Sequence, residues 1–168
     1  MKSNKLEVKI DDNVLTMTRS FKASPKLLFE VWSSCEHLKH WWGPKEWPMA
    51  ECEMDFREGG TWRYCLRGPN EEDQSWGKTI YQKIDKPNKI EYKDYFTDPE
   101  GNVLSNMPEL DNSVEFIPQD GGTTTALMTT TFENNDQLTS ILEMGMEEGL
   151  NSSMDRLDEY LAEIPTSV

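Results

Sequence analysis

The run from Asn135 to Ile164 constrains the fold more than any other stretch of this sequence. It contains no proline, and its apolar residues recur at steps of three and four, which places them on one stripe of a helix. The stripe consists of Leu138, Ile141, Leu142, Met146, Leu150, Met154, Leu157, Leu161 and Ile164. Acidic residues occupy the opposite face. At 1.5 Å per residue, the run predicts one helix about 45 Å long, enough to cross a small domain.

Two glycines lie within this predicted helix. Gly145 and Gly149 are four residues apart, on or beside the apolar stripe, and each costs up to about 1 kcal/mol relative to alanine in a helix interior. They permit close packing against a strand, or they leave room beside the helix for a bound molecule. The neighbouring Met144 and Met146 fit either interpretation, because methionine fills irregular gaps and also lines adaptable sites.

Length and charge narrow the class of protein. The 168 residues favour one domain over positions 1–168, of which 165–168 are expected to form a flexible tail. The net charge of −14 repels phosphate groups and anionic lipids, so we expect no nucleic-acid partner and no membrane partner. No apolar run is long enough to cross a bilayer, and the N-terminus lacks the apolar core of a signal peptide. These features favour a cytoplasmic protein, either a monomer or a homodimer.

The cysteines are Cys35, Cys52 and Cys65. Their number is odd, their spacing is irregular, and no Cys-x-x-Cys motif occurs. Without an export signal, this pattern predicts three reduced thiols.

The first part of the chain predicts a strand followed by two short helices. Residues Lys5–Phe21 read as one long interrupted strand or as a hairpin that turns at Asp11–Asn13. Ser24-Pro25 is typical of a helix start, with serine as the N-cap and proline at the first helical position. A second short helix is expected from Ser34 to Trp42, where Gly43-Pro44 ends it.

Between Trp47 and Phe132 the pattern changes to short aromatic and β-branched runs separated by turns. The expected strands are Thr61–Arg67, Ser75–Ile84, Lys89–Phe96, Ser113–Ile117 and Thr123–Phe132. Short turns between consecutive strands give an antiparallel meander, and the long helix is the only element able to cover its apolar face. We therefore predict an α+β fold: a curved antiparallel sheet of about six or seven strands with two short helices and one long C-terminal helix. A strongly bent sheet cannot close tightly along one helix, so a cavity is expected between them.

Five segments resemble a known family, in the same order along the chain. They are Phe21–Trp32, Leu38–Pro44, Gly59–Arg63, Trp76-Gly77 followed by Ile84–Ile90, and Met144–Gly149 with Leu157–Leu161. The chain is similar to the SRPBCC superfamily, the START-like helix-grip proteins. Within it, the resemblance is to the branch named after the C-terminal domain of the activator of the ninety-kilodalton heat-shock chaperone's ATPase. The similarity spans about Leu15 to Ile164 and implies the helix-grip fold. The superfamily includes lipid carriers, cyclases and hydrolase-like enzymes, so the resemblance implies no single function. Leu150 departs from the pattern, since a tryptophan often follows the second helix glycine.

Metal and catalytic motifs are weak. His37 and His40 are the only histidines, and Cys35 lies two residues before the first. Zinc accepts both ligand types, but Cys35 and His37 project from different sides of a helix and no further ligand cluster follows. We predict no metal site and no cofactor. Two neighbouring histidines do not define a base with an orienting partner, so no catalytic residue is predicted.

Aromatic and methionine side chains are the strongest candidates for a binding site, because such walls suit a flat, mostly apolar small molecule. Ordinary core positions are expected for at least half of the aromatic residues. The predicted cavity wall comprises Trp41, Trp42, Trp62, Tyr64, Trp76, Tyr92, Phe96, Met128, Leu142, Met146 and Leu150. Because Trp41 and Trp42 are adjacent, they point in different directions, and one is expected in the core while the other borders the cavity mouth.

Three functions follow from these features. The first is a binding protein that holds a hydrophobic or aromatic small molecule in the cavity. The second is a cyclase- or hydrolase-like enzyme that uses tyrosine hydroxyls or His40 there, which requires a buried polar group with a partner in the cavity. The third is a co-chaperone or stress-response protein whose partner is a chaperone. It ranks below the first, because the chain offers no extra partner-binding region beyond the domain.

Overall fold

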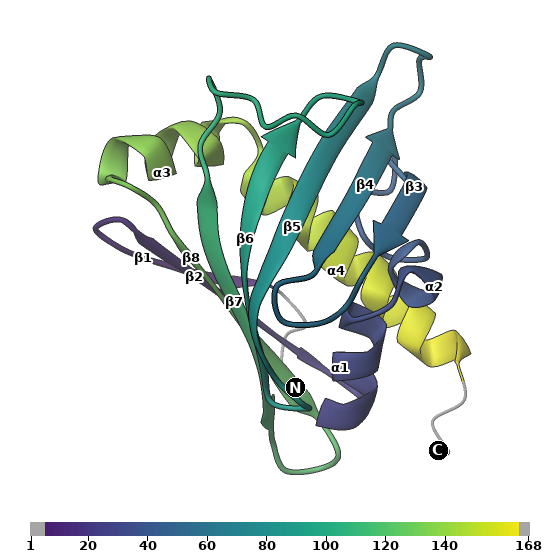
Figure 1. Cartoon of the computed structure of the whole chain (residues 1–168). Coiled ribbons are helices and arrows are strands. Elements are labelled where there is room, and N and C mark those ends of the chain that lie inside the picture. Colours follow the sequence, from purple (N-terminus) through teal and green to yellow (C-terminus); the bar gives the residue numbers. More distant parts are fainter. Residues whose placement is uncertain (1–5, 165–168) are drawn as a thin grey trace.

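The structure, a computed structural model, describes residues 6–164 as one antiparallel sheet with four helices (Figure 1). The predicted tail at 165–168 lies outside the described residues. The strands are β1 (Glu7–Asp11), β2 (Val14–Phe21), β3 (Met49–Met54), β4 (Thr61–Arg67), β5 (Gln74–Asp85), β6 (Lys89–Thr97), β7 (Leu110–Pro118) and β8 (Thr124–Thr131). The helices are α1 (Pro25–Trp32), α2 (Cys35–Leu38), α3 (Asn135–Glu143) and α4 (Met146–Glu163). The α+β class is confirmed.

The sheet has eight strands, more than the six or seven predicted, in the order β1-β2-β8-β7-β6-β5-β4-β3. The sequence pattern did not predict β3. This edge strand is short and mixes partly buried with exposed positions, so it lacks a clear apolar alternation. The N-terminal segment forms the hairpin alternative, with Asp11 pairing with Val14 across the turn. The pairing of β2 with β8 then joins this N-terminal hairpin to the last strand of the sheet.

Strict alternation along β2 and β8 builds this part of the concave face of the sheet. In β2 every second residue is buried, and β8 shows the same pattern in the opposite phase. Met17 of β2 lies opposite Met128 of β8, and Met128 in turn lies opposite Val114 of β7. This buried face curves around α4, which crosses it diagonally (Figure 1).

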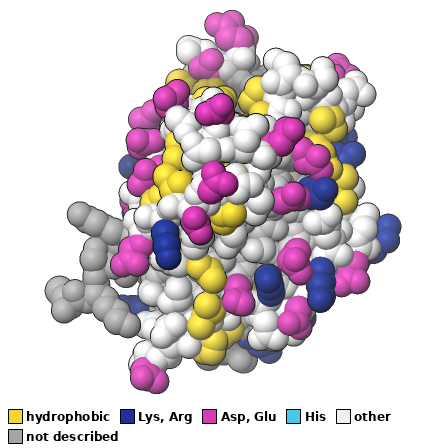
Figure 2. Space-filling model, turned by 90° about the vertical axis from the view of Figure 1, so that its left-hand side faces the viewer, with side chains coloured by type: hydrophobic (Ala, Val, Ile, Leu, Met, Phe, Trp, Pro, Cys, Tyr) yellow, Lys and Arg dark blue, Asp and Glu magenta, His cyan; other side chains and the backbone are white. Residues whose placement is uncertain are grey.

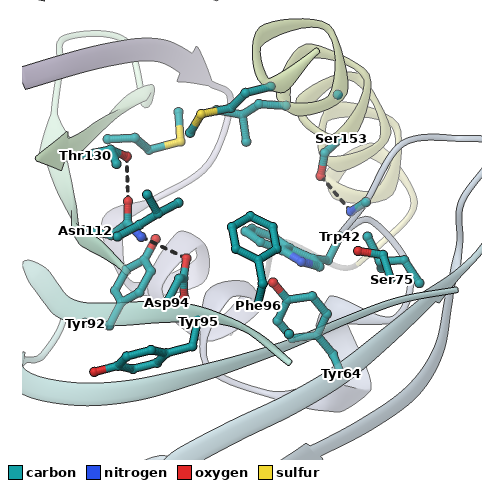
Figure 3. Close-up of a pocket in the computed structure, with 18 of the residues that line it drawn as sticks. Trp42, Tyr64, Ser75, Tyr92, Asp94, Tyr95, Phe96, Asn112, Thr130 and Ser153 are labelled. Atoms are coloured by element: carbon teal, nitrogen blue, oxygen red, sulfur yellow. Dashed lines mark hydrogen bonds between the residues drawn. The ribbon is translucent and has the colours of Figure 1, made fainter. Parts of the chain in front are cut away.

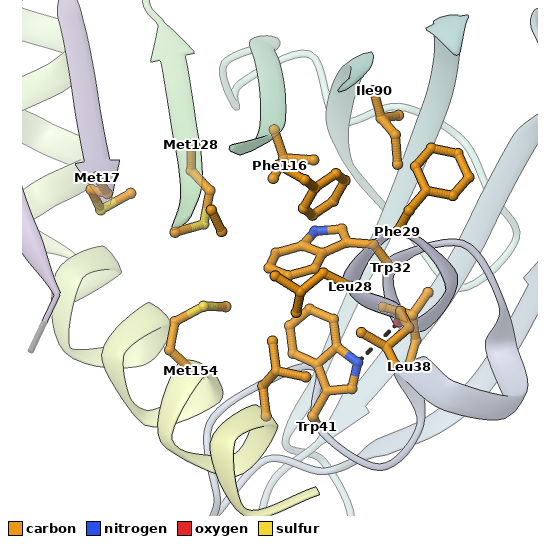
Figure 4. Packing of buried hydrophobic residues seen from close by; sticks show 14 of the residues in the cluster. Met17, Leu28, Phe29, Trp32, Leu38, Trp41, Ile90, Phe116, Met128 and Met154 are labelled. Carbon is orange, nitrogen blue, oxygen red and sulfur yellow. Dashed lines mark hydrogen bonds between the residues drawn. The ribbon is translucent and has the colours of Figure 1, made fainter. Parts of the chain in front are cut away.

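The two short helices begin where the sequence predicted and close one end of the core. The Ser24 hydroxyl accepts a hydrogen bond from the Leu27 amide at 3.1 Å, which caps α1. Trp32 at the end of α1 packs edge-on against Trp41 and Phe116, with ring centroids 4.6 and 5.3 Å away (Figure 4). Trp41 is fully buried, and its indole N–H donates to the Val31 carbonyl at 3.1 Å. The second helix is shorter than predicted: α2 ends at Leu38, and turns carry the chain to Trp42.

The prediction of one continuous C-terminal helix was wrong, because the run breaks at Gly145. This residue has a φ of 93°, a left-handed conformation that glycine adopts without the clash a Cβ atom would cause. The break separates α3, which contacts β2, from α4, which crosses the sheet. Periodicity missed it because a single left-handed residue changes the direction of a helix without removing the stripe of apolar side chains.

Side chains of α4 are bonded to the segment that follows α2. The Ser153 hydroxyl donates to the Trp41 carbonyl at 2.8 Å and accepts from the Gly43 amide at 3.2 Å. The Arg156 guanidinium donates to the carbonyls of Gly43 and His40 at 2.9 and 3.1 Å. These bonds satisfy main-chain groups that no strand or helix pairs.

An ion pair also fixes α4 to β2, on the buried face of the sheet. Arg19 of β2 is only 3% exposed, and its guanidinium lies 2.8 Å from Asp155 and 3.6 Å from Asp158 of α4. A buried arginine is tolerated only when it is paired with anions, so the two aspartates hold α4 in this register on the sheet.

The prediction of three reduced thiols was wrong for two of them. Cys35 of α2 and Cys52 of β3 form a disulfide, while Cys65 is buried and free. The irregular spacing gave no sign of this pair, because the pairing depends on the packing of α2 beside β3 in the folded chain. Disulfides are rare in cytosolic proteins, so the cytoplasmic location stays a prediction without structural support.

The surface is dominated by mixed charge. Acidic side chains are spread over the face shown in Figure 2, among fewer basic ones and short apolar strips. The large apolar side chains with the greatest exposure among the described residues are Ile10, Val103 and Met144, which come from three separate parts of the chain. None of the described helices is both long enough and apolar enough to cross a lipid bilayer.

The two helix glycines predict opposite effects of alanine. Gly145→Ala forces a left-handed φ on a residue with a side chain, so we expect a loss of about 1 kcal/mol in the free energy of unfolding. Gly149 has helical geometry, and an added Cβ would meet only Pro44, at 3.6 Å. Gly149→Ala should therefore stabilise by about 0.5–1 kcal/mol. Urea denaturation of both variants measures the difference, and equal losses in the two would contradict the helix break.

Candidate functional site

A cavity of about 270 Å³ lies between α4, the concave face of the sheet and the segment after α2 (Figure 3). Helix α4 contributes Met146, Gly149, Leu150 and Ser153 to its lining. Strands β4 to β8 contribute most of the remaining wall, with Trp42, Gly43 and Pro44 at one end. The cavity therefore lies beside the part of α4 that follows Gly145 and that Ser153 bonds to the segment after α2.

Most of the residues predicted for the cavity wall lie in this lining. They are Trp42, Tyr64, Trp76, Tyr92, Phe96, Met128, Met146 and Leu150. Trp41, Trp62 and Leu142 lie elsewhere. Trp41 is in the core, Trp62 lies behind Trp42 with its indole N–H 3.1 Å from the Cys52 sulfur, and Leu142 packs against the core from the end of α3. The adjacent tryptophans thus divide between core and cavity.

Trp42, Trp62 and Tyr64 form a contiguous aromatic cluster at the α2 end of the cavity. The Trp42 ring centroid lies 5.3 Å from that of Trp62 and 6.2 Å from that of Tyr64, in edge-on geometry. Tyr64 pairs across the sheet with Gly77, where an added Cβ would lie 2.6 Å from the tyrosine ring. Gly77 is therefore the residue that lets the Tyr64 ring lie over β5.

A row of polar side chains crosses the otherwise apolar face of the sheet. Asp94 of β6 accepts hydrogen bonds from the Thr79 hydroxyl of β5 and, at 2.8 Å, from the Asn112 amide of β7. The Asn112 carbonyl accepts from the Thr130 hydroxyl of β8. The row thus runs Thr79–Asp94–Asn112–Thr130 over four neighbouring strands, and its last three members line the cavity (Figure 3).

Sequence reasoning missed Asp94, although a signal was present. The predicted strand placed Ile90, Tyr92 and Phe96 on one face, and alternation puts Asp94 on that same face. A carboxylate between aromatic residues on a buried strand face indicates either a structural ion pair or a functional site. Thr79 and Asn112 are the neutral partners that identify it as a hydrogen-bonded acid in a cavity wall.

Burial changes the acidity of Asp94 and its neighbours. Removal from water raises the pKa of Asp94 from its usual 3.8 to about 7, and the hydrogen bond from Thr79 partly opposes this rise. Burial and the nearby Asp94 also raise the pKa values of Tyr64 and Tyr92, so both phenols stay protonated at neutral pH. The lining contains no lysine, arginine or histidine, and Asp94 is its one carboxylic acid.

The two histidines lie outside the cavity and pack against α4. The His37 ring nitrogen Nδ1 is 2.6 Å from the Tyr160 hydroxyl, and the His40 ring stacks on Tyr160 with centroids 4.9 Å apart. His40 is absent from the cavity lining, so the structure does not place it as an acid or base there. Within residues 6–164, no group of three or more His, Cys, Asp or Glu side chains is arranged to hold a metal ion.

Comparison with known proteins places the chain in a family with many solved structures. The family model described as Activator of Hsp90 ATPase homolog 1-like protein matches residues 22–162. No curated protein matches the sequence significantly.

Three of the similar solved structures are bacterial proteins. Protein Ms6760 from Mycobacterium smegmatis is 28% identical with a TM-score of 0.85, and the match covers 95% of this chain and 98% of that one. A protein from Arthrobacter aurescens is 27% identical with a TM-score of 0.85, covering 96% and 94%. A protein from Staphylococcus epidermidis is 27% identical with a TM-score of 0.80, covering 93% of each chain. These likenesses agree with the helix-grip fold described above.

The raised pKa of Asp94 predicts an unusual dependence of stability on pH. The folded protein binds the Asp94 proton more tightly than the unfolded chain does. The contribution of Asp94 to the free energy of unfolding is therefore greatest below about pH 4 and is lost as pH rises through about 7. We expect the wild type to lose roughly 2–4 kcal/mol from this source between pH 4 and pH 8. Asp94→Asn keeps both hydrogen bonds, since the amide can accept from Asn112 and donate to Thr79.

The test is the difference in the free energy of unfolding between wild type and Asp94→Asn, measured by urea denaturation at several pH values. Asp98 and Glu109 have lowered pKa values and contribute the opposite slope at low pH, but they do so equally in both proteins. The variant should gain on the wild type as pH rises from 5 to 8. Parallel curves would show that Asp94 titrates normally.

Proposed function

The chain belongs to the family of Activator of Hsp90 ATPase homolog 1-like proteins, and on that premise we propose that it binds a hydrophobic or aromatic small molecule in the cavity under α4. The observation that carries the proposal is the cavity of about 270 Å³ walled by aromatic and methionine side chains. Side chains of the molecule leave this volume unfilled, although unfilled volume in a core lowers stability.

The size of the cavity supports a ligand of modest dimensions. An apolar cavity of about 150 Å³ accepts a benzene molecule. A cavity of about 270 Å³ therefore has room for a fused two-ring aromatic molecule or an alkyl chain of similar volume.

The side chains that line the cavity support the same class of ligand, an aromatic or alkyl molecule. Trp42, Tyr64 and Phe96 present ring faces and edges that pack against a flat apolar body. Met128 and Met146 are flexible and adapt to its outline. A polar group on the ligand would find an anchoring position at Asp94, the one carboxylic acid in the lining.

Asp94 also favours a second function, an enzyme of the cyclase or hydrolase kind. A carboxyl group with a pKa of about 7 can both accept and donate a proton near neutral pH. The residue expected to act is then Asp94, rather than His40 as the sequence suggested.

This second function has a direct test. If the protein is an enzyme, NMR of a ligand recovered after incubation with the wild type should show a chemical change. The rate of that change should have an inflection near pH 7, and Asp94→Asn should abolish the reaction. Recovery of every bound molecule unchanged leaves binding alone.

The description of the family refers to activation of the ATPase of Hsp90. An interaction of this chain with a chaperone rests on that description, and it ranks below small-molecule binding because the cavity gives the latter a defined site.

Filling the cavity predicts a loss of binding. Leu150→Trp places an indole in the lining in place of a smaller side chain, so we expect at least a tenfold weaker affinity for any ligand of the wild type. The measurement is a thermal-shift and native mass spectrometry screen of neutral and charged naphthalenes, indoles and long-chain alcohols. A ligand at one hundred times its Kd should stabilise the wild type by about 2.7 kcal/mol.

Met144→Trp is the matched control. Met144 is 66% exposed, so this substitution adds the same indole outside the cavity. It should bind like the wild type. If no compound binds the wild type, the proposed function fails. If Leu150→Trp binds as well as the control, the ligand binds elsewhere.

A further inference from the structure

We propose that the ligand of this cavity is a hydrophobic amine, a molecule with an aromatic or alkyl body and one protonated nitrogen that pairs with Asp94. The inference rests on the proposed small-molecule site and names its ligand class. Two independent features of the described cavity carry it: a carboxylate without a cationic partner, and an aromatic wall around it.

Asp94 has hydrogen bonds but no counter-charge. Its partners, Thr79 and Asn112, are both neutral. No lysine, arginine or histidine appears among the residues that line the cavity, and none of the ion pairs within residues 6–164 includes Asp94. Enclosed carboxylates are normally paired with a cation, because an isolated charge away from water is costly. Within residues 6–164 no side chain supplies a cation to the ionised Asp94, so the ligand is the source of positive charge in this proposal.

The aromatic lining suits that charge. Trp42, Tyr64, Trp76, Tyr92 and Phe96 all contribute to the same cavity as Asp94. The faces of aromatic rings carry partial negative charge and attract ammonium groups, most strongly where water is excluded. Asp94 therefore makes one end of the cavity anionic, and the aromatic walls can contact both the apolar body of the ligand and its ammonium group.

The charge of Asp94 and the net charge of the protein argue against the other main classes of ligand. A ligand that carries a carboxylate or phosphate would face Asp94 with no basic side chain in the lining to compensate. The net charge of −14 lowers the local concentration of anions and raises that of cations. A neutral apolar molecule fits the walls but gives Asp94 no cationic partner.

Pairing with an amine links binding to the ionisation of Asp94. The titratable groups that face Asp94 are Tyr64, Tyr81 and Tyr92, whose pKa values are raised so that they remain neutral. Asp94 is then the group that changes charge between pH 5.5 and 8, and only its ionised form attracts the ammonium. Affinity for the amine should rise roughly tenfold or more across this interval.

The experiment compares two ligands of the same shape by isothermal titration calorimetry, 2-(2-naphthyl)ethylamine and 2-(2-naphthyl)ethanol. At pH 8 the amine should bind the wild type at least tenfold more tightly than the alcohol. At pH 5.5 the preference should fall below roughly threefold as Asp94 takes up a proton. The pH series uses the wild type alone, so it holds even if a variant fails to fold.

Asp94→Asn should remove the preference, so that the amine and the alcohol bind with similar affinities at pH 8. Asp111→Asn is the matched control, because it removes one negative charge from a side chain that is 55% exposed and outside the cavity lining. It should retain the preference. A preference that survives Asp94→Asn reflects the overall charge and overturns the inference.

The outcomes separate the two proposals. If the alcohol binds the wild type as tightly as the amine at pH 8, the amine assignment fails while the binding function stands. If neither ligand binds, and the wider screen finds no other, the proposed function itself fails.

Discussion

The hydrogen bonds from α4 to the segment after α2 determine most of what is distinctive in this structure. Ser153 and Arg156 satisfy main-chain groups between His40 and Gly43, so the helix is held to that segment by polar contacts. These contacts place Trp42 at the end of the cavity and keep α4 at a fixed distance from the sheet. Hydrophobic packing favours closure of empty space, and directional bonds of this kind oppose that closure.

The row from Thr79 to Thr130 gives the cavity a set of hydrogen-bonded polar side chains. Each of its four members lies on a different strand, so the sheet register itself brings them into hydrogen-bonding distance. A site that hydrogen-bonds its ligand discriminates far more strongly than an apolar pocket does, because the wrong ligand leaves buried polar groups unpaired. Specificity of the proposed site would therefore depend on strand pairing as much as on the side chains that touch a ligand.

The parts of the structure that follow from local patterns could be predicted from the sequence. Serine and proline at the start of α1, the strand segments β4 and β6, and the apolar stripe of α4 are each encoded within one segment. The parts that depend on the packing of distant segments could not. The Cys35–Cys52 bond requires α2 to lie beside β3, and the role of Asp94 requires Thr79 and Asn112 on the neighbouring strands. The break at Gly145 was missed for another reason, since a left-handed glycine and a helical one look the same in a sequence.

The disulfide between α2 and β3 has a consequence for how the sheet ends. A strand at the edge of a sheet exposes unpaired main-chain groups that can recruit a further strand from another molecule. In β3 this edge is short, carries the exposed acidic residues Glu51 and Glu53, and has α2 held beside it by a covalent bond. Like charges on an approaching copy would repel, and the attached helix obstructs its access. Both features make β3 a poor template for edge-to-edge addition of another chain.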